Sequence, residues 1–119
     1  MNKPDAEATI PTEIVVTTRE RQRHPRWLAQ LEGEGAPRQF QLTSDRMVIG
    51  RAEDAEVRLL SSRASRQHAF VERRGEDFVV RDNDSRNGIF LNGLRVHSAV
   101  LRDGDLVQVG DSSFAFHEP

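Results

Sequence analysis

Arginine side chains gather in one stretch of the chain and are candidates for holding a negatively charged ligand. Arg58, Arg63 and Arg66 lie within residues 57–70, which contain no acidic residue and directly follow the acidic residues 53–56. A guanidinium presents paired N–H donors in a fixed plane, which fits the oxygens of a phosphate group better than an ammonium does. An overall net charge of −2 with one basic loop is the pattern expected for the capture of a small anion.

Four short motifs place polar residues and glycines at the ends of apolar segments. In chain order they are Gly50-Arg51, Ser65-Arg66-Gln67-His68, Ser85-Arg86-Asn87-Gly88 and Asn92-Gly93. Gly50 allows a bend or a close approach of the backbone just before Arg51. Asn92-Gly93 is the strongest signal for a two-residue hairpin turn, because a type I′ turn needs a positive φ at both positions. No motif is specific alone, so what each one indicates depends on the elements around it.

Short apolar segments separated by turn residues predict an all-β fold. From Trp27 onward the apolar residues alternate with a period of two, which puts Trp27, Ala29 and Leu31 on one face of the first segment. No stretch shows helical periodicity over the length of a helix, and many short strands at close spacing favour a sandwich or a barrel. The other candidate strands lie around residues 40–42, 47–49, 57–59, 69–71, 78–80, 89–91, 94–96, 106–109 and 114–116.

Length and composition favour one domain preceded by a tail. The 119 residues are 36% hydrophobic and contain no Cys, so one core is possible and a disulfide is not. Residues 1–25 carry three prolines and few apolar residues, and we predict a flexible tail there and a single domain over residues 26–119. The negative net charge argues against nucleic-acid binding. The sequence has no apolar run long enough to span a membrane and no signal-peptide pattern, which predicts a cytoplasmic protein without membrane contact.

Taken together, the four motifs resemble the signature of the forkhead-associated (FHA) domain. The resemblance extends over roughly residues 27 to 117 of the chain. It implies a β-sandwich of two antiparallel sheets with about eleven short strands, whose loops at one end bind phosphothreonine in another protein. The expected partner is a protein phosphorylated on Thr, either a Ser/Thr protein kinase or its substrate, and no cofactor is expected.

The resemblance also implies a role for individual residues of the motifs. Arg51 would contact the phosphate and Ser65 would donate its hydroxyl to it, while Arg66 would lie along the bound peptide. Asn87 would hydrogen-bond the peptide backbone, because an amide side chain both donates and accepts. Arg86 stands where many family members have Thr, and it would assist by adding positive charge near the phosphate.

The same resemblance makes His68 a structural residue that holds a loop by hydrogen bonds. Ile89 stands where family members frequently have Thr, and this departure concerns loop packing more than binding. Neither residue is expected to contact the ligand.

Other kinds of site fit the sequence less well. Asp82-x-Asp84-x-Arg86 begins like a calcium loop, but it has Asn87 at the sixth position and Gly93 at the twelfth. No nucleophile-elbow motif surrounds Ser65, so no catalytic residue and no enzymatic activity are predicted. The alternative from a different class is a phosphate-independent scaffold that docks a partner through a face of the sandwich, in which Arg51 and Ser65 would have no role.

Two threonines in the predicted tail are candidate phosphoacceptors. Thr17 and Thr18 follow the segment Glu13-Ile14-Val15-Val16, an arrangement that resembles small bacterial FHA proteins with a phosphorylatable threonine pair near the N-terminus. In those proteins the phosphorylated tail binds its own domain. A tether gives effective concentrations of order mM, so a weak site could become occupied by the protein's own tail.

Overall fold

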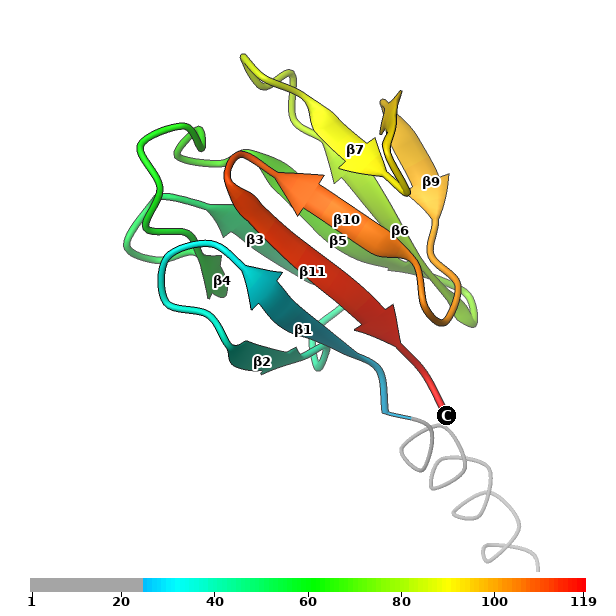
Figure 1. Ribbon diagram of the computed structural model, residues 1–119. Coiled ribbons are helices and arrows are strands. Elements are labelled where there is room, and N and C mark those ends of the chain that lie inside the picture. Colours follow the sequence, from blue (N-terminus) through cyan, green and yellow to red (C-terminus); the bar gives the residue numbers. More distant parts are fainter. Residues whose placement is uncertain (1–24) are drawn as a thin grey trace, which may run out of the picture.

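The computed structural model describes residues 25–119, and these residues form two β-sheets (Figure 1). The predicted tail and the candidate phosphoacceptors Thr17 and Thr18 lie outside the described residues, apart from residue 25. Between residues 25 and 119 there is no helix that could cross a membrane. The eleven strands are β1 (Trp27–Glu32), β2 (Arg38–Gln41), β3 (Arg46–Gly50), β4 (Val57–Arg58), β5 (Ala69–Arg74), β6 (Asp77–Asp82), β7 (Ile89–Leu91), β8 (Leu94–Val96), β9 (Ser98–Val100), β10 (Leu106–Val109) and β11 (Ser112–His117).

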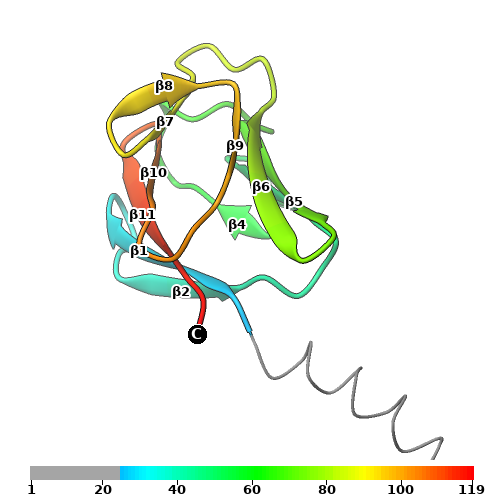
Figure 2. The same cartoon turned by 90° about the vertical axis from the view of Figure 1, so that its right-hand side faces the viewer.

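The two sheets pack face to face, as predicted for a β-sandwich (Figure 2). One sheet has the strand order β2-β1-β11-β10-β7-β8, and the other has the order β4-β3-β5-β6-β9. All pairings are antiparallel except that of β3 with the two-residue strand β4, which is parallel. The core between the sheets is built from inward-facing apolar side chains of both, among them Leu28, Ile49, Phe78, Val80 and Phe114.

The hairpin between β7 and β8 has the predicted turn. Asn92 has a φ of 50° and Gly93 a φ of 87°, the positive values that a type I′ turn requires. The Asn92 side chain adds to this, since its Oδ1 accepts a hydrogen bond from the Leu106 amide at 2.9 Å. The turn therefore ties the hairpin to the neighbouring strand β10.

Strand β1 buries a polar side chain that the apolar pattern does not indicate. Trp27, Ala29 and Leu31 share a face as predicted, but this face points outward, while Leu28 and Gln30 point into the core. The Gln30 amide is fully hydrogen-bonded there, because its Oε1 accepts from Arg38 Nε at 2.7 Å and its Nε2 faces main-chain carbonyls of the following turn. A buried amide with partners on both sides costs little, so this polar residue is compatible with the core.

The outer face of the five-stranded sheet is covered by charged side chains. Glu72 on β5 lies between three arginines and accepts hydrogen bonds from Arg81 at 3.0 Å and from Arg74 at 3.1 Å, while Arg46 Nε lies 3.5 Å away. Beneath them, Arg46 and Arg81 stack over the ring of Phe70, at 3.8 and 4.9 Å from its centroid. These side chains shield Phe70 from water and leave a charged surface.

We expect this cluster to make the stability of the protein depend on pH. The hydrogen bond from Arg81 lowers the pKa of the Glu72 carboxyl below its usual value of 4.5, although partial burial opposes the shift. A lowered pKa in the folded state means that the contribution of Glu72 is complete above pH 4.5 and is lost as the pH falls below it. Urea unfolding of Glu72→Gln should therefore differ most from the native protein near neutral pH, and the difference should shrink in acid. A difference that stays constant with pH would contradict this.

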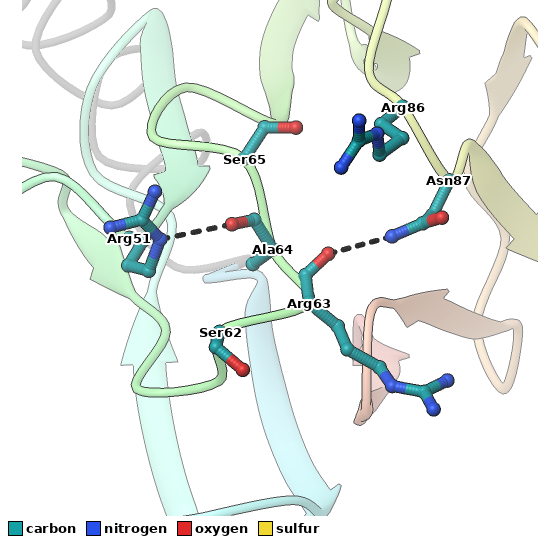
Figure 3. Close-up of a pocket in the computed structure, with 7 residues that line it drawn as sticks. All are labelled: Arg51, Ser62, Arg63, Ala64, Ser65, Arg86 and Asn87. Carbon is teal, nitrogen blue, oxygen red and sulfur yellow. Dashed lines mark hydrogen bonds between the residues drawn. The ribbon is translucent and has the colours of Figure 1, made fainter.

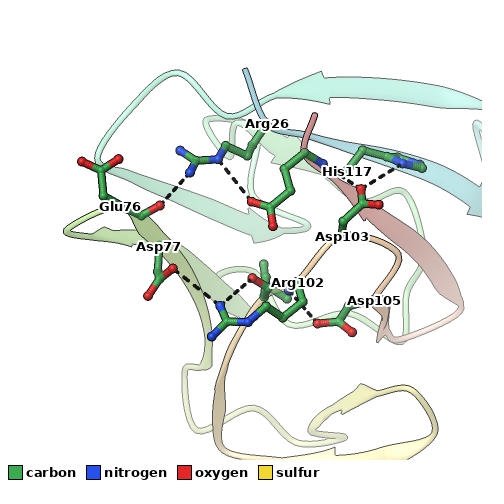
Figure 4. Close-up of polar contacts among 9 residues, drawn as sticks. Arg26, Glu76, Asp77, Arg102, Asp103, Asp105 and His117 are labelled. Carbon is green, nitrogen blue, oxygen red and sulfur yellow. Dashed lines mark hydrogen bonds and ion pairs between the residues drawn. The ribbon is translucent and has the colours of Figure 1, made fainter. Parts of the chain in front are cut away.

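Both ends of the described domain meet at one end of the sandwich (Figure 4). Arg26, just before β1, donates to the Glu76 carbonyl at 2.7 Å and pairs with Glu118, just after β11, at 3.4 Å. The Glu118 amide donates to the Asp103 carboxylate at 2.9 Å. Arg102 pairs with Asp77 at 3.5 Å, and this ion pair joins the loop between β9 and β10 to the start of β6. The two ends of the domain are thus held side by side.

Candidate functional site

Three loops meet at the opposite end of the sandwich and enclose a pocket. They follow β3 (residues 51–56), precede β5 (residues 59–68) and connect β6 to β7 (residues 83–88). The pocket has a volume of about 480 Å³. It is lined by Arg51, Ser62, Arg63, Ala64, Ser65, Arg86 and Asn87 (Figure 3).

Arg51 is fixed at the edge of the pocket by the backbone around it. Its amide donates to the Ser65 carbonyl at 3.0 Å, and its side-chain Nε donates to the Ala64 carbonyl at 3.1 Å. These two hydrogen bonds hold the guanidinium in one orientation against the loop before β5. Its terminal amino groups have no hydrogen-bond partner among residues 25–119, so they are available to a ligand.

Gly50 allows this arrangement because the chain passes very close to it. A Cβ at position 50 would collide with the carbonyl of Arg66, with the carbonyl carbon at 2.7 Å and the His68 amide nitrogen at 3.0 Å. The predicted close approach of the backbone at Gly50 is therefore confirmed. Main-chain hydrogen bonds on either side, from His68 to Ile49 at 2.9 Å and from Ala52 to Arg66 at 3.0 Å, leave the two segments no room to separate.

We expect Gly50→Ala to destabilise the protein by about 3 kcal/mol, because the methyl group would meet backbone and not a movable side chain. The free energy of unfolding, measured by urea denaturation, tests this. Gly75→Ala is a suitable comparison for the loss of a glycine, since a Cβ there meets nothing within 4 Å and only its positive φ of 63° is unfavourable. Equal losses in the two variants would contradict the role assigned to the contact at Gly50.

His68 connects two of the three loops from inside the protein. It is fully buried, and its Nδ1 accepts a hydrogen bond from the Ser65 amide at 3.0 Å. Its Nε2 lies 2.8 Å from the Gly88 carbonyl. Because Nδ1 accepts and a carbonyl can only accept, the ring carries its proton on Nε2 and donates it to Gly88. The position of Ser65 is thereby coupled to the turn that follows Asn87.

Asp82 and Ser85 organise the loop between β6 and β7. The Asp82 carboxylate accepts from the Ser85 hydroxyl at 2.6 Å and from the Ser85 amide at 3.2 Å. The Ser85 oxygen in turn accepts from the Gly88 amide at 2.8 Å. The Asp82 carboxylate, which stands at the first position of the calcium-loop pattern, thus stabilises the turn at Ser85 by hydrogen bonds.

Two further hydrogen bonds join this loop to the loop before β5. Asn83 Nδ2 donates to the Gln67 carbonyl at 3.0 Å, and Asn87 Nδ2 donates to the Arg63 carbonyl at 2.9 Å (Figure 3). Together with His68, these bonds fix the relative position of the two loops. A ligand therefore meets a preformed site and does not have to order the loops, which favours affinity.

The structure brings four of the five predicted contact residues into one pocket. Arg51, Ser65, Arg86 and Asn87 all line it, and Arg66 does not. Arg66 follows Ser65 directly, on the exposed side of the same loop.

Sequence reasoning missed the contribution of residues 62–64. Ser62 and Arg63 line the pocket, and the carbonyls of Arg63 and Ala64 anchor Asn87 and Arg51. Main-chain carbonyls leave no signal in the type of side chain, so they could not be found. The sequence marks Arg63 only as part of the basic stretch. In the structure its guanidinium lies 3.7 Å from the Asp111 carboxylate at the edge of the site.

The pocket offers donors and positive charge to a ligand. Within residues 25–119, neither the Arg86 guanidinium nor the Ser65 hydroxyl has an ion-pair or hydrogen-bond partner, and Figure 3 shows Ser65 between Arg51 and Arg86. Two guanidinium groups and a hydroxyl around one depression suit a dianionic group with several acceptor oxygens. No three His, Asp or Glu residues of the described part of the chain gather to hold a metal ion.

A comparison with protein families and known proteins agrees with this geometry. The family model described as FHA domain matches residues 47–110, which include every residue that lines the pocket. An ABC transporter ATP-binding/permease protein of Mycobacterium tuberculosis is 43% identical over 68 residues, which are 57% of this chain and 8% of the transporter. The chain thus spans only a small part of this much longer relative.

Solved structures resemble the fold closely. One solved structure comes from a structural and functional analysis of phosphothreonine-dependent FHA domain interactions. It matches this chain with a TM-score of 0.71 and 30% sequence identity, over 78% of this chain and 95% of the other. The structure of Mycobacterium tuberculosis EmbR in complex with a low affinity phosphopeptide has a TM-score of 0.73 and 27% identity, over 90% of this chain and 30% of the other.

Proposed function

The chain belongs to the FHA domain family, and from this premise we propose that residues 26–119 act as a phosphothreonine-dependent protein-interaction module without catalytic activity. The observation that carries the proposal is the preformed pocket in which Arg51, Ser65, Arg86 and Asn87 come together. Two solved structures with a similar fold are described by phosphothreonine-dependent interactions and by a bound phosphopeptide. This similarity supports a phosphothreonine peptide as the ligand of this chain.

The geometry supports a role for each residue. Arg51 and Ser65 hold the phosphate oxygens, because their free donors face the same depression. Asn87 Nδ2 is engaged with Arg63, which leaves the Asn87 side-chain oxygen to accept a hydrogen bond from the backbone of a bound peptide. Arg86 adds charge from the opposite side, and Arg66 contacts the peptide beside the phosphothreonine.

The proposed partner is a cytoplasmic protein phosphorylated on Thr by a Ser/Thr kinase, or the kinase itself. An internal partner is also proposed, since phosphorylation of Thr17 or Thr18 would place the ligand on the same chain. Mass spectrometry after kinase treatment tests this second idea, and the absence of phosphate from residues 9–18 would remove it.

Calorimetric titration of the full chain with a degenerate peptide library tests the main proposal. The library is used in three forms, with phosphothreonine, phosphoserine or unmodified threonine. We expect micromolar binding of the first form and none of the third. Phosphoserine should bind about fourfold more weakly, because one buried methyl group is worth about 0.8 kcal/mol. Equal binding of the phosphorylated and unmodified forms would favour a phosphate-independent scaffold instead.

A further inference from the structure

The two outer faces of the sandwich differ in chemistry. The five-stranded sheet is covered by the charged cluster around Glu72. The outer face of the six-stranded sheet carries mostly apolar and uncharged side chains instead, and Leu31 and Leu106 are 53% and 46% exposed there. In a chain with 30% charged residues, such a face is unusual, and exposed apolar patches of this kind mark interaction surfaces.

Strand register shows how these side chains are arranged. Residues paired directly across an antiparallel sheet point to the same side. Ala29 on β1, Ala115 on β11 and Leu106 on β10 therefore form one row. Near one end of the face, Leu31 and Phe90 stand on either side of an open groove of about 460 Å³, with Leu106 and Gln108 between them.

A second row ends in opposite charges. Glu32 pairs with Ser113, Ser113 with Gln108, Gln108 with Phe90, and Phe90 with Arg95. The row crosses five strands, from β1 to β8, with β10 in the middle. Its interior is uncharged, and its only charged members are Glu32 at one end and Arg95 at the other.

We propose that this face binds the same face of a second copy of the chain, about a two-fold axis parallel to β10. Rotation about that axis reverses the order of the strands, so Glu32 of each copy meets Arg95 of the other. Leu31, beside Glu32, then lies next to Arg95 of the other copy, Phe90 lies opposite Ser113, and the two Leu106 side chains meet near the axis. An uncharged surface with opposite charges at its two margins is complementary to itself, which a two-fold contact requires. The charged outer face of the other sheet offers no such match.

The size of the face predicts a weak dimer. The five strands that overlap, β1 to β8, span roughly 19 Å and their length is about 17 Å, a footprint of roughly 320 Å². A stable interface buries about 800 Å² on each partner, so this contact should form only at tens to hundreds of micromolar. An axis parallel to the strands leaves both phosphopeptide pockets open at the same end of the dimer. Dimerisation would then favour a partner that carries two phosphothreonines.

Sedimentation equilibrium of the full chain from about 10 µM to 1 mM tests the proposal. We expect a reversible dimer whose dissociation constant rises at least tenfold in Leu106→Glu. Val100→Glu is the matched control, because Val100 is a 40% exposed apolar residue on the outer face of the other sheet. Mixing Leu106→Glu with Leu106→Lys should restore association, which a merely destabilised fold would not do. Thermal melting of each variant checks the fold.

A charge exchange tests the geometry of the contact. Glu32→Arg and Arg95→Glu should each weaken the dimer about fivefold, and the double variant should return to within about twofold of the native value. A chain that stays monomeric up to 1 mM, equal losses in Leu106→Glu and Val100→Glu, or additive losses in the double variant would each overturn the proposal. The dimer does not depend on phosphate, so its failure and that of the phosphothreonine proposal are distinguishable.

Discussion

Arg51→Ala is expected to weaken binding of a phosphothreonine peptide at least tenfold, because each charge-assisted hydrogen bond contributes about 1.5 to 3 kcal/mol. The fold should remain, since within residues 25–119 the Arg51 side chain makes a single hydrogen bond, to the Ala64 carbonyl. Calorimetric titration of the variant with the phosphorylated and the unmodified peptide measures the effect. The expected result is that the phosphorylated peptide binds the variant at least tenfold more weakly than it binds the native protein.

Two further variants separate the geometry of Arg51 from its charge. Arg51→Lys keeps the charge but loses the Nε donor that binds Ala64 and the planar fork that fits phosphate, so it should recover little of the affinity. Arg102→Ala removes an arginine whose side chain is 64% exposed, at the end of the sandwich away from the pocket, and should bind normally. Normal binding by Arg51→Lys together with weaker binding by Arg102→Ala would point to net charge and not to the geometry of the site.

His68→Ala is expected to lower the free energy of unfolding by about 3 kcal/mol or more. The substitution leaves the Ser65 amide and the Gly88 carbonyl without partners in a buried space, and it also creates a cavity. Affinity for the phosphopeptide should fall as well, although the His68 side chain lies inside the protein. The reason is that Ser65 and Asn87 depend on this residue for their relative position.

Urea denaturation together with peptide titration measures both effects, and His117→Ala is the matched control. His117 stacks on Trp27 with ring centroids 5.2 Å apart and has a 39% exposed side chain at the far end of the molecule. Its loss should change stability by less than about 1 kcal/mol and leave binding intact. If His68→Ala kept full affinity at a much reduced stability, the two loops would not need this connection to form the site.

The sequence allows the fold and most of the pocket to be predicted, for reasons that differ between residues. The turn at Asn92-Gly93 could be predicted because few residue types accept positive φ at two successive positions. Gly50 and His68 could be identified because they stand in motifs that resemble those of the FHA family. The structure explains why these residue types are needed: Gly50 is in close contact with the backbone, and His68 makes two hydrogen bonds inside the protein.

Other features leave no pattern in the sequence. Strand β9 has only three residues and is mostly exposed, so periodicity did not reveal it. The burial of Gln30 depends on Arg38 of the next strand, and the parallel pairing of β3 with β4 depends on how the chain returns after Arg51. In the pocket, main-chain carbonyls of the loop before β5 hold the side chains that bind, and any residue type could supply them.

The meeting of Arg26 with Glu118 has a consequence for how the domain can be used in larger proteins. Because the chain enters and leaves at one point, at the end away from the pocket, the unit could be inserted into a surface loop of another protein without opening either fold. It could equally stand at either terminus with its ligand site facing outward. Architecture of this kind makes a recognition domain portable between unrelated host proteins.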